Sequence, residues 1–227
     1  MTREAMIAAN LAEVRERIAQ AALSAGRQPD DVTLIAVTKT WPLSDVRILR
    51  DLGLCDFGES RDQEAREKAE EWRRVDGRDV HWHFIGQLQS NKAKSVAGYA
   101  STVHTVDRLS LVQALRKTAV PLDCLVQLSI DGDPERGGVP VAELGQLAAA
   151  VTDPLRLRGI MAVAPLDMDP AVAFAAVAEA HRTLLEHFPL ATMRCIGMSD
   201  DFEAAIAAGA THVRIGSALL GNRSTAH

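Results

Sequence analysis

Lys39 is the residue whose type and position point most directly to chemistry. It closes the apolar run from Val32 to Thr38, which is typical of a buried strand, in a chain with 5 lysines against 20 arginines. Burial at the end of a strand lowers the pKa of an amine and frees its lone pair to attack an aldehyde. One interpretation of Lys39 is therefore a Schiff-base lysine. The other is a strand-end lysine whose amine reaches solvent along its stem.

A second group of small polar residues follows the last two predicted strands. Ser199 follows one of them, and Gly216 and Ser217 follow the other. Small residues allow close backbone approach, and free N–H groups at a following helix start would point toward an anion, so this pattern favours a phosphate site. The competing interpretation is a helix cap in which Asp200 and Glu203 form a capping box, although capping and phosphate binding can coexist.

Arg214 lies inside the last predicted strand, two residues before Gly216. Alternation along a strand places its side chain on the same inward face as Gly216 and His212. A buried guanidinium is costly without an acceptor, so Arg214 requires either a carboxylate or an acceptor supplied by a ligand. Glu59, at the end of the second predicted strand, is the candidate for an internal ion pair, and both options stay open.

Other residues of chemical interest give weaker signals. A strand histidine such as His83 is more often a satisfied core residue than a general base, and the histidines show no metal-ligand spacing. The alternating charges between Arg61 and Arg74 are most simply a solvated helix face. The cysteines are widely spaced and form no CxxC pair, which indicates reduced thiols rather than zinc ligands or disulfides: Cys55, Cys124 and Cys195.

Composition places the chain among ordinary globular proteins. Its 227 residues are 47% apolar, and the net charge of -5 with a pI near 5.8 argues against a nucleic-acid or anionic-membrane surface. Residues 1–26 have charged and apolar positions at helical spacing, which predicts an amphipathic helix packing on the barrel rather than a signal peptide. We therefore expect a cytoplasmic protein that binds neither nucleic acid nor membrane.

Short β-branched runs alternate with segments of helical length along the whole chain. The predicted strands are Val32 to Lys39, Asp56 to Glu59, Trp82 to Gly86, Thr102 to Val106, Asp123 to Ile130, Arg156 to Val163, Met193 to Met198 and His212 to Ser217. The predicted helices are Leu43 to Leu52, Asp62 to Arg74, Asn91 to Ala97, Arg108 to Thr118, Val141 to Val151, Pro170 to His187 and Phe202 to Ala208. This order predicts an α/β fold, a single (β/α)8 TIM-type barrel with an extra N-terminal helix, forming one domain over residues 1–227. A doubly wound open sheet would place a glycine-rich turn after the first strand, and the turn from Thr38 to Pro42 has no glycine.

Several segments of the chain together resemble one known family. They are LIAVTKT, FGES, WHFIGQLQSNK, VHTVDR, LRGIMAVAP and GMSDDFEAAIAAGATHVRIGSALLG. In this order they resemble the YggS/PROSC family of pyridoxal phosphate homeostasis proteins, which bind pyridoxal 5'-phosphate (PLP) and are related to the N-terminal barrel of alanine racemase. The resemblance covers nearly the whole chain and implies a PLP-binding barrel domain.

The resemblance also implies a role for each site residue. It implies a covalent PLP aldimine on Lys39, phosphate binding by Ser199, Gly216 and Ser217, and a contact between Arg214 and the pyridine nitrogen. It further implies a cofactor contact at Ser60, where the family often has asparagine. Arg136 stands where relatives commonly have lysine, so any secondary role of that lysine in handling PLP is not carried over.

The resemblance implies a protein that holds PLP for intracellular PLP homeostasis, with apo PLP-enzymes as candidate recipients. The alternative is a PLP-dependent racemase-like enzyme, which needs a second acid/base that alanine racemases supply as a tyrosine from an additional domain. This chain ends soon after the last predicted strand, and its one tyrosine, Tyr99, is expected toward the opposite face of the barrel. Arg214 would also keep the pyridine nitrogen unprotonated, which makes the ring a poorer electron sink.

We therefore expect no enzyme, with residual activity on amino acids as the open alternative. A third option keeps the barrel and its phosphate site without PLP, as in enzymes of phosphorylated sugars. No clear dimer helix is evident, and we expect a monomer.

Overall fold

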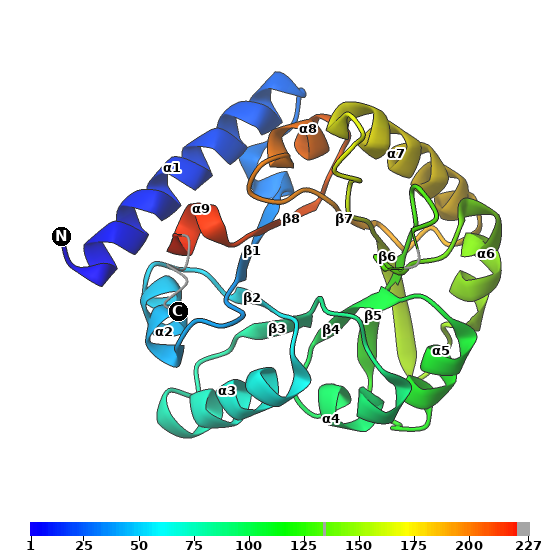
Figure 1. Cartoon of the computed structure of the whole chain (residues 1–227), viewed down its shortest axis with the longest axis horizontal. Helices are drawn as coiled ribbons and strands as arrows, with labels where there is room; N and C mark the ends of the chain where they lie inside the picture. The colour runs from blue at the N-terminus through cyan, green and yellow to red at the C-terminus, as the bar shows by residue number, and fades with distance from the viewer. Residues whose placement is uncertain (134, 222–227) are drawn as a thin grey trace.

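Eight parallel strands close into a barrel in the computed structural model, which describes residues 1–133 and 135–221. Each strand pairs with the next along the chain and β8 pairs with β1, so the order around the barrel follows the sequence (Figure 1). The strands are β1 (Thr33–Val37), β2 (Asp56–Glu59), β3 (His81–Phe84), β4 (Thr102–Val106), β5 (Leu122–Gln127), β6 (Leu155–Met161), β7 (Met193–Cys195) and β8 (His212–Ile215). The predicted (β/α)8 barrel with a helix before its first strand is confirmed. Residues 134 and 222–227 of the predicted domain lie outside the described residues.

Helices occupy the connections between strands and surround the barrel (Figure 1). They are α1 (Arg3–Ser24), α2 (Leu43–Asp51), α3 (Asp62–Val75), α4 (Ala93–Ala97), α5 (Leu109–Arg116), α6 (Val141–Ala150), α7 (Pro170–His187), α8 (Phe202–Ala207) and α9 (Ser217–Leu220), with 3-10 turns η1 (Pro29–Asp31) and η2 (Ser90–Lys92). The segment predicted as one helix from Asn91 is divided into η2 and α4. No helix in the described ranges has the length and apolar character needed to cross a membrane.

Six of the described strands end two or three residues before their predicted ends, namely β1, β3, β5, β6, β7 and β8. β7 ends at Cys195 and β8 ends at Ile215, although both runs continue further along the sequence. The backbone leaves the strand direction because Gly197 has a φ of +90° and Ser217 begins α9. The polar residues predicted at strand ends therefore lie on loops and on a short helix.

Part of the barrel interior is occupied by a small apolar cluster. Ile35, Leu125, Met161 and Cys195 are buried there, one from each of four strands. Gly58 faces the same interior, where an added Cβ would lie 3.3 Å from Ile35 Cγ2, so the missing side chain leaves room for Ile35. These apolar side chains pack against one another inside the barrel.

The N-terminal helix α1 packs along the outside of the barrel beside α9 and α8 (Figure 1). Asn10 Nδ2 donates to the carbonyl of Leu219 at 2.9 Å, and Arg3 Nη1 donates to the carbonyl of Leu220 at 2.9 Å. These bonds satisfy carbonyl groups at the end of α9. The buried face of α1 repeats every three or four residues, as an amphipathic helix requires: Ile7, Leu11, Val14, Ile18 and Ala22.

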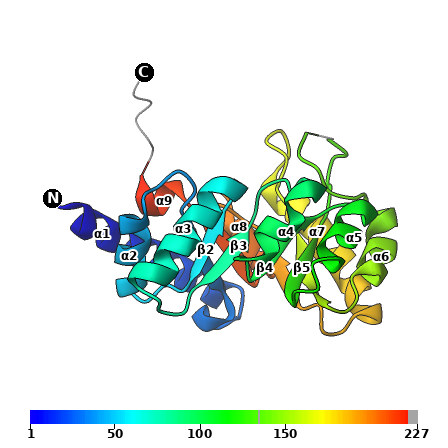
Figure 2. The same cartoon turned by 90° about the horizontal axis from the view of Figure 1, so that it is seen from below.

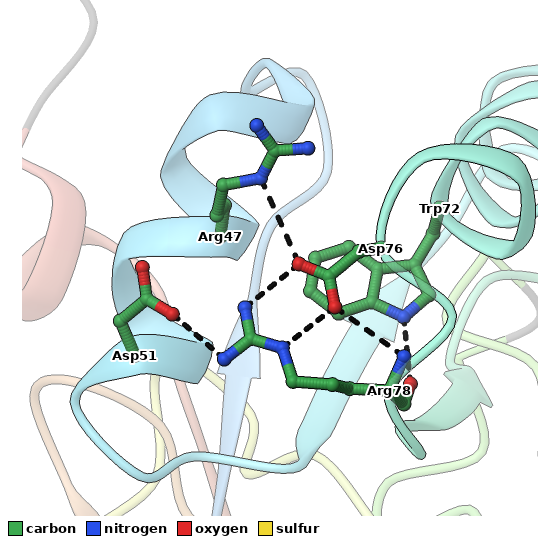
Figure 3. Close-up of polar contacts among 5 residues, drawn as sticks. All are labelled: Arg47, Asp51, Trp72, Asp76 and Arg78. Atoms are coloured by element: carbon green, nitrogen blue, oxygen red, sulfur yellow. Dashed lines mark hydrogen bonds and ion pairs between the residues drawn. The ribbon is translucent and has the colours of Figure 1, made fainter.

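A polar network joins α2 to the connection between α3 and β3 (Figure 3). The Arg78 guanidinium donates twice to Asp76, at 2.6 and 2.7 Å, and once to Asp51 at 2.7 Å, while Arg47 Nε lies 3.7 Å from Asp76. Trp72 Nε1 donates to the carbonyl of Arg78 at 2.8 Å. Hydrogen bonds from Arg78 lower the pKa of Asp76 to about 2. The network therefore stays charged at ordinary pH and fixes the connection that leads into β3.

Replacing Ile35 with alanine tests the packing of the barrel interior. Ile35→Ala should lower the free energy of unfolding by about 2 to 5 kcal/mol, because it removes buried methyl groups and leaves a cavity. Leu166→Ala is the control, since Leu166 is 97% exposed and its truncation should change stability by less than about 0.5 kcal/mol. Urea denaturation followed by circular dichroism measures both, and equal losses would contradict the described packing.

Candidate functional site

The C-terminal end of the barrel collects the residues that the sequence singles out. β7, β8 and β1 are neighbours, and the segments that follow them carry Ser199, Gly216 and Lys39. An added Cβ at Gly216 would lie 3.4 Å from the Cβ of Val37, which precedes Lys39 by two residues. Figure 2 shows α9 on the same side of the barrel as the β5–α6 and β6–α7 connections. Lys39 and the predicted phosphate residues therefore share one end of the barrel.

Backbone N–H groups at the start of α9 converge on the Ser199 hydroxyl. The N–H of Gly216 lies 3.4 Å from Ser199 Oγ, and the N–H of Ala218 lies 3.5 Å from it. Both bonds are long and weak, so these donors have capacity for a stronger acceptor such as a phosphate oxygen. Ser217 is exposed at the first position of α9. The structure thus brings together Ser199, Gly216 and Ser217 as one cup of donors, which we call the α9 cup.

The loop before α8 is closed differently from the prediction. Asp201 Oδ1 accepts the N–H of Met198 at 2.5 Å, while Asp200 is exposed. Glu203 is 2.6 Å from an Arg17 nitrogen of α1, because α1 packs against α8 and draws this side chain outward. The predicted capping box of Asp200 and Glu203 is therefore wrong.

Arg214 lies in the barrel interior with 4% of its surface exposed. Its Nη1 donates to the carbonyl of Cys195 at 2.7 Å and lies 3.3 Å from Cys195 Sγ, and its Nη2 donates to the carbonyl of Ala162 at 3.1 Å. The alternative ion pair with Glu59 is wrong. Gly58 faces the barrel interior, so alternation along β2 directs the Glu59 side chain outward. There Glu59 pairs with Lys68 of α3 at 2.5 Å.

Arg214 forms no ion pair with a carboxylate within residues 1–133 and 135–221. The nearby Asp201 carboxylate is buried, which raises its pKa above the ordinary value although the charge of Arg214 acts to lower it, and its Oδ1 accepts the N–H of Met198. Burial raises the pKa of the Cys195 thiol, which therefore stays neutral beside Nη1. Burial also lowers the pKa of His104 well below its ordinary value, so this neighbouring imidazole is neutral as well. Carbonyl groups satisfy only part of a guanidinium with five N–H donors and leave its charge uncompensated. An acceptor supplied by a ligand would fill this need.

Lys39 follows β1 in a tight turn. The N–H of Trp41 donates to the carbonyl of Thr38 at 3.0 Å, and Thr40 has a φ of +67°. These features fit a type II turn with Lys39 at its second position. The Lys39 side chain is exposed, as the interpretation of a strand-end lysine that reaches solvent requires, and burial by the protein alone is not seen. The strand ends at Val37, before Lys39, and leaves its side chain beyond the packed wall; any desolvation of its amine would come from a bound molecule.

Ser60 and Arg136 share no hydrogen bond with the other candidate residues in the described structure. Ser60 is half-buried just after β2, where its carbonyl packs so tightly on Gly86 that a side chain at position 86 would collide with it. Arg136 pairs with Asp131 and lies 3.2 Å from Asp133, both in its own loop. The contact expected of Ser60 stays a prediction, and Arg136 is engaged locally.

Sequence reasoning missed a buried polar cluster behind Lys39. The charges of α3 were predicted to be solvated, which is wrong for Lys68, because only 7% of it is exposed. Its Nζ donates to the carbonyl of Thr38 at 2.9 Å and to Glu59. Helical spacing could have revealed it, since Lys68 falls on the buried stripe of α3 with Ala65, Ala69 and Trp72.

The opposite, N-terminal end of the barrel holds a separate cavity of about 570 Å³. Asp56 Oδ1 there lies 3.0 Å from His81 Nδ1 and 3.0 Å from His83 Nε2, and His83 Nδ1 lies 2.9 Å from His104 Nε2. Burial opposes ionisation of Asp56, but hydrogen bonds from His83 and His81 still hold its pKa below the ordinary value. A charged Asp56 only accepts hydrogen bonds, so His83 Nε2 donates its N–H to Asp56. His83 is a satisfied core histidine, as predicted, and no group of three or more His, Cys, Asp or Glu in the described chain is arranged to hold a metal ion.

Tyr99 lies away from the α9 cup. It is buried just before β4, and its charged neighbours are Asp62, Glu59 and Arg66, which belong to α3 and to the outer face of β2. Burial raises the pKa of its phenol well above the ordinary value. Tyr99 is therefore placed outside the barrel wall, near the last residue of β2 and the first residue of α3, so its expected position toward the opposite face of the barrel is wrong. Its phenol lies among side chains of α3 and not in the barrel interior.

Comparisons with known proteins agree over nearly the whole chain. Residues 7–224 match the family model described as the alanine racemase N-terminal domain. The chain is 40% identical over 240 residues to the pyridoxal phosphate homeostasis protein of Mycobacterium leprae, covering 96% of this chain and 93% of the relative. It is 41% identical over 226 residues to the protein of that name from Escherichia coli, covering 96% and 97%.

Solved structures give the same picture. PipY of Synechococcus elongatus PCC7942, described with PLP bound, is similar with a TM-score of 0.80 and 32% identity. The match covers 95% of this chain and 100% of the PipY chain. The similarity therefore extends over the barrel and its surrounding helices.

The histidines near the N-terminal cavity predict a pH dependence of stability. Burial lowers the pKa of His212 to about 4, whereas in the unfolded chain it titrates near the ordinary value of about 6.5. Between these values the unfolded state binds more protons, so the free energy of unfolding falls as the pH is lowered through this window. His212→Asn should make that fall smaller in urea denaturation. His187→Asn, at an exposed position, should leave it as in the wild type, and a wild-type slope in His212→Asn would refute the assignment.

Proposed function

Because the chain belongs to the pyridoxal phosphate homeostasis protein family, whose barrel is the alanine racemase N-terminal domain, we propose that it binds PLP in intracellular PLP homeostasis. The observation that carries the proposal is the buried, uncompensated guanidinium of Arg214 beside the α9 cup. PLP is a phosphorylated pyridine, so it offers a ring-nitrogen acceptor for the guanidinium and phosphate oxygens for the cup. Both needs are met at the same end of the barrel.

The phosphate is assigned to the α9 cup. Ser199 supplies its hydroxyl, and the backbone N–H groups at Gly216, Ser217 and Ala218 supply donors from the start of α9. Close approach is possible because Gly216 carries no side chain. The weak bonds that now join these groups to one another would be exchanged for charge-assisted bonds to the phosphate.

The aldehyde and the ring are assigned to three further residues. Lys39, in the turn after β1, forms the Schiff base, which is the covalent aldimine that the family resemblance implies. Arg214 donates to the pyridine nitrogen, and Ser60 adds a polar contact from the end of β2. The pyridine ring of PLP bound at Lys39 would also remove water from the amine of this exposed side chain. The protein alone does not shield that amine.

We propose that the protein holds PLP and does not use it as an enzyme. Bound PLP supplies an electron sink, but a guanidinium keeps its proton and leaves the pyridine nitrogen unprotonated, so the sink is weakened. Tyr99 is buried outside the barrel wall and is no second acid/base. In this proposal residues 1–227 form one PLP-binding domain, which acts as a cytoplasmic monomer and passes PLP to apo PLP-enzymes.

Reduction with borohydride tests the role of Lys39. Wild-type protein mixed with PLP should gain a visible absorption band, and after reduction the peptide containing Lys39 should carry the mass of one phosphopyridoxyl group. Lys39→Ala should show neither, while Lys117→Ala, at an exposed lysine outside the site, should behave as the wild type. Modification at another lysine would contradict the assignment. Racemisation of alanine or serine by the loaded wild type would favour the enzyme alternative.

Replacing Arg214 tests the observation that carries the proposal. Arg214→Gln should weaken PLP binding by about tenfold to a hundredfold, because it removes a hydrogen bond from a charged donor. Arg116→Gln is the control, since Arg116 is exposed on α5. Equilibrium dialysis measures both affinities, and unchanged binding in Arg214→Gln would remove the main support for the site.

A further inference from the structure

The backbone just before Lys39 is held by a buried pair of charged side chains. Lys68 Nζ donates to the carbonyl of Thr38 at 2.9 Å and to Glu59 Oε1 at 2.5 Å. Thr38 Oγ1 donates to the same Glu59 oxygen at 2.7 Å. The side chains of Lys68 and Glu59 are 6% and 1% exposed. Thr38 is thus fixed both by its carbonyl and by its hydroxyl.

The backbone just after Lys39 is held by Glu64. Glu64 Oε1 accepts the N–H of Thr40, and Lys68 Nζ lies 3.3 Å from this same oxygen, so one ammonium joins both sides of the turn. Thr40 has a φ of +67°, which a β-branched residue rarely adopts and which type II turns usually assign to glycine or asparagine. The bond to Glu64 therefore stabilises a backbone conformation that Thr40 disfavours.

Stability alone gives no reason for this cluster. Charged groups lose hydration when they are buried, and apolar residues of similar size often stabilise a protein as well or better. Glu59 Oε2 is buried without a hydrogen-bond partner in the described structure, so the cluster is not fully satisfied even now. Each of its remaining bonds leads to Thr38, to Thr40 or to another member of the cluster. Its effect is concentrated on the two residues that flank Lys39.

We propose that Glu59, Glu64 and Lys68 are positioning residues that hold the Thr38–Thr40 turn so that the Lys39 amine meets the PLP aldehyde. The proposal rests on the function proposed above, because it takes Lys39 as the Schiff-base residue. The Lys39 side chain is exposed and flexible, so the protein restrains its amine mainly through the backbone at its root. A displacement of about 1 Å between reacting groups costs up to about a hundredfold in reaction, which sets the scale of the effect.

Glu64→Ala tests the proposal without removing the buried ion pair. We expect the apparent equilibrium constant for Schiff-base formation with PLP to fall by about tenfold. Binding of pyridoxine 5'-phosphate, which has no aldehyde, should stay within about twofold of the wild type, because phosphate and ring contacts are retained. Glu64→Gln keeps an oxygen that accepts the Thr40 N–H and should restore most of the loss. Glu67→Ala, at an exposed glutamate on the same helix, is the matched control.

Thr40→Gly supplies a second, independent variant. Glycine adopts a positive φ without strain, so Glu64→Ala should cost less in a Thr40→Gly background than in the wild type. Equal costs in the two backgrounds would overturn the proposal. So would equal losses for PLP and pyridoxine 5'-phosphate, which would show a merely structural role, or wild-type binding of both.

Amide hydrogen exchange separates failure of this proposal from failure of the proposed function. The Thr40 N–H should be protected in the wild type without PLP and exposed to exchange in Glu64→Ala. Rapid exchange of the Thr40 N–H in the wild type would show that Glu64 does not hold the turn, and would overturn the proposal. A protected turn in a wild type that forms no Schiff base at Lys39 would overturn the proposed function, and with it the role given to the turn.

Discussion

An unbalanced positive charge inside the barrel is the constraint on which the site depends. Arg214 is buried among carbonyl groups and a neutral thiol, and it forms no direct ion pair in the described residues, where the nearby Asp201 carboxylate instead accepts the N–H of Met198. Burying such a charge is costly in the empty protein, so the interior is electrostatically incomplete until an acceptor is present. The α9 cup is similarly unsaturated, because its donors share one serine hydroxyl over long distances. The Arg214 guanidinium and the N–H groups of the α9 cup thus lie at the same end of the barrel. Together they suit one ligand that carries two separate acceptor groups.

The sequence predicted the fold because strand and helix periodicities alternate so regularly. It also predicted that Ser199, Gly216 and Ser217 would meet, since parallel strands of a barrel present their ends on one face. A Schiff base at Lys39 was one interpretation of its position at a strand end. PLP as its aldehyde, and the contact of Arg214 with the pyridine nitrogen, came only from family resemblance, because no spacing rule distinguishes a PLP aldehyde from another carbonyl. Ser217, the first residue of α9, was taken for the end of a strand, and α9 itself was not predicted, since four residues are too few to show a helical period.

The errors have a common physical origin in side-chain direction. Glu59 was offered as a partner for Arg214, yet one step of strand alternation sends it to the opposite face, where it meets Lys68. The charges of α3 were treated as one solvated face, yet one of them lies on the buried stripe. Lys39 was predicted as the last residue of its strand, yet the strand ends at Val37 and a turn follows, which leaves the side chain exposed. In each case a single residue step, below the precision of a periodicity argument, decided the environment.

The bonds from α1 to α9 make the first helix part of the binding apparatus. Asn10 and Arg3 hold the carbonyl groups at one end of α9, while the other end offers its N–H groups to the cup. Since a helix of four residues has little rigidity of its own, its orientation is inherited from α1, whose buried stripe is anchored along the barrel. The first and the last described helices are thereby mechanically coupled, and a disturbance of α1 would be transmitted to the N–H donors at the start of α9.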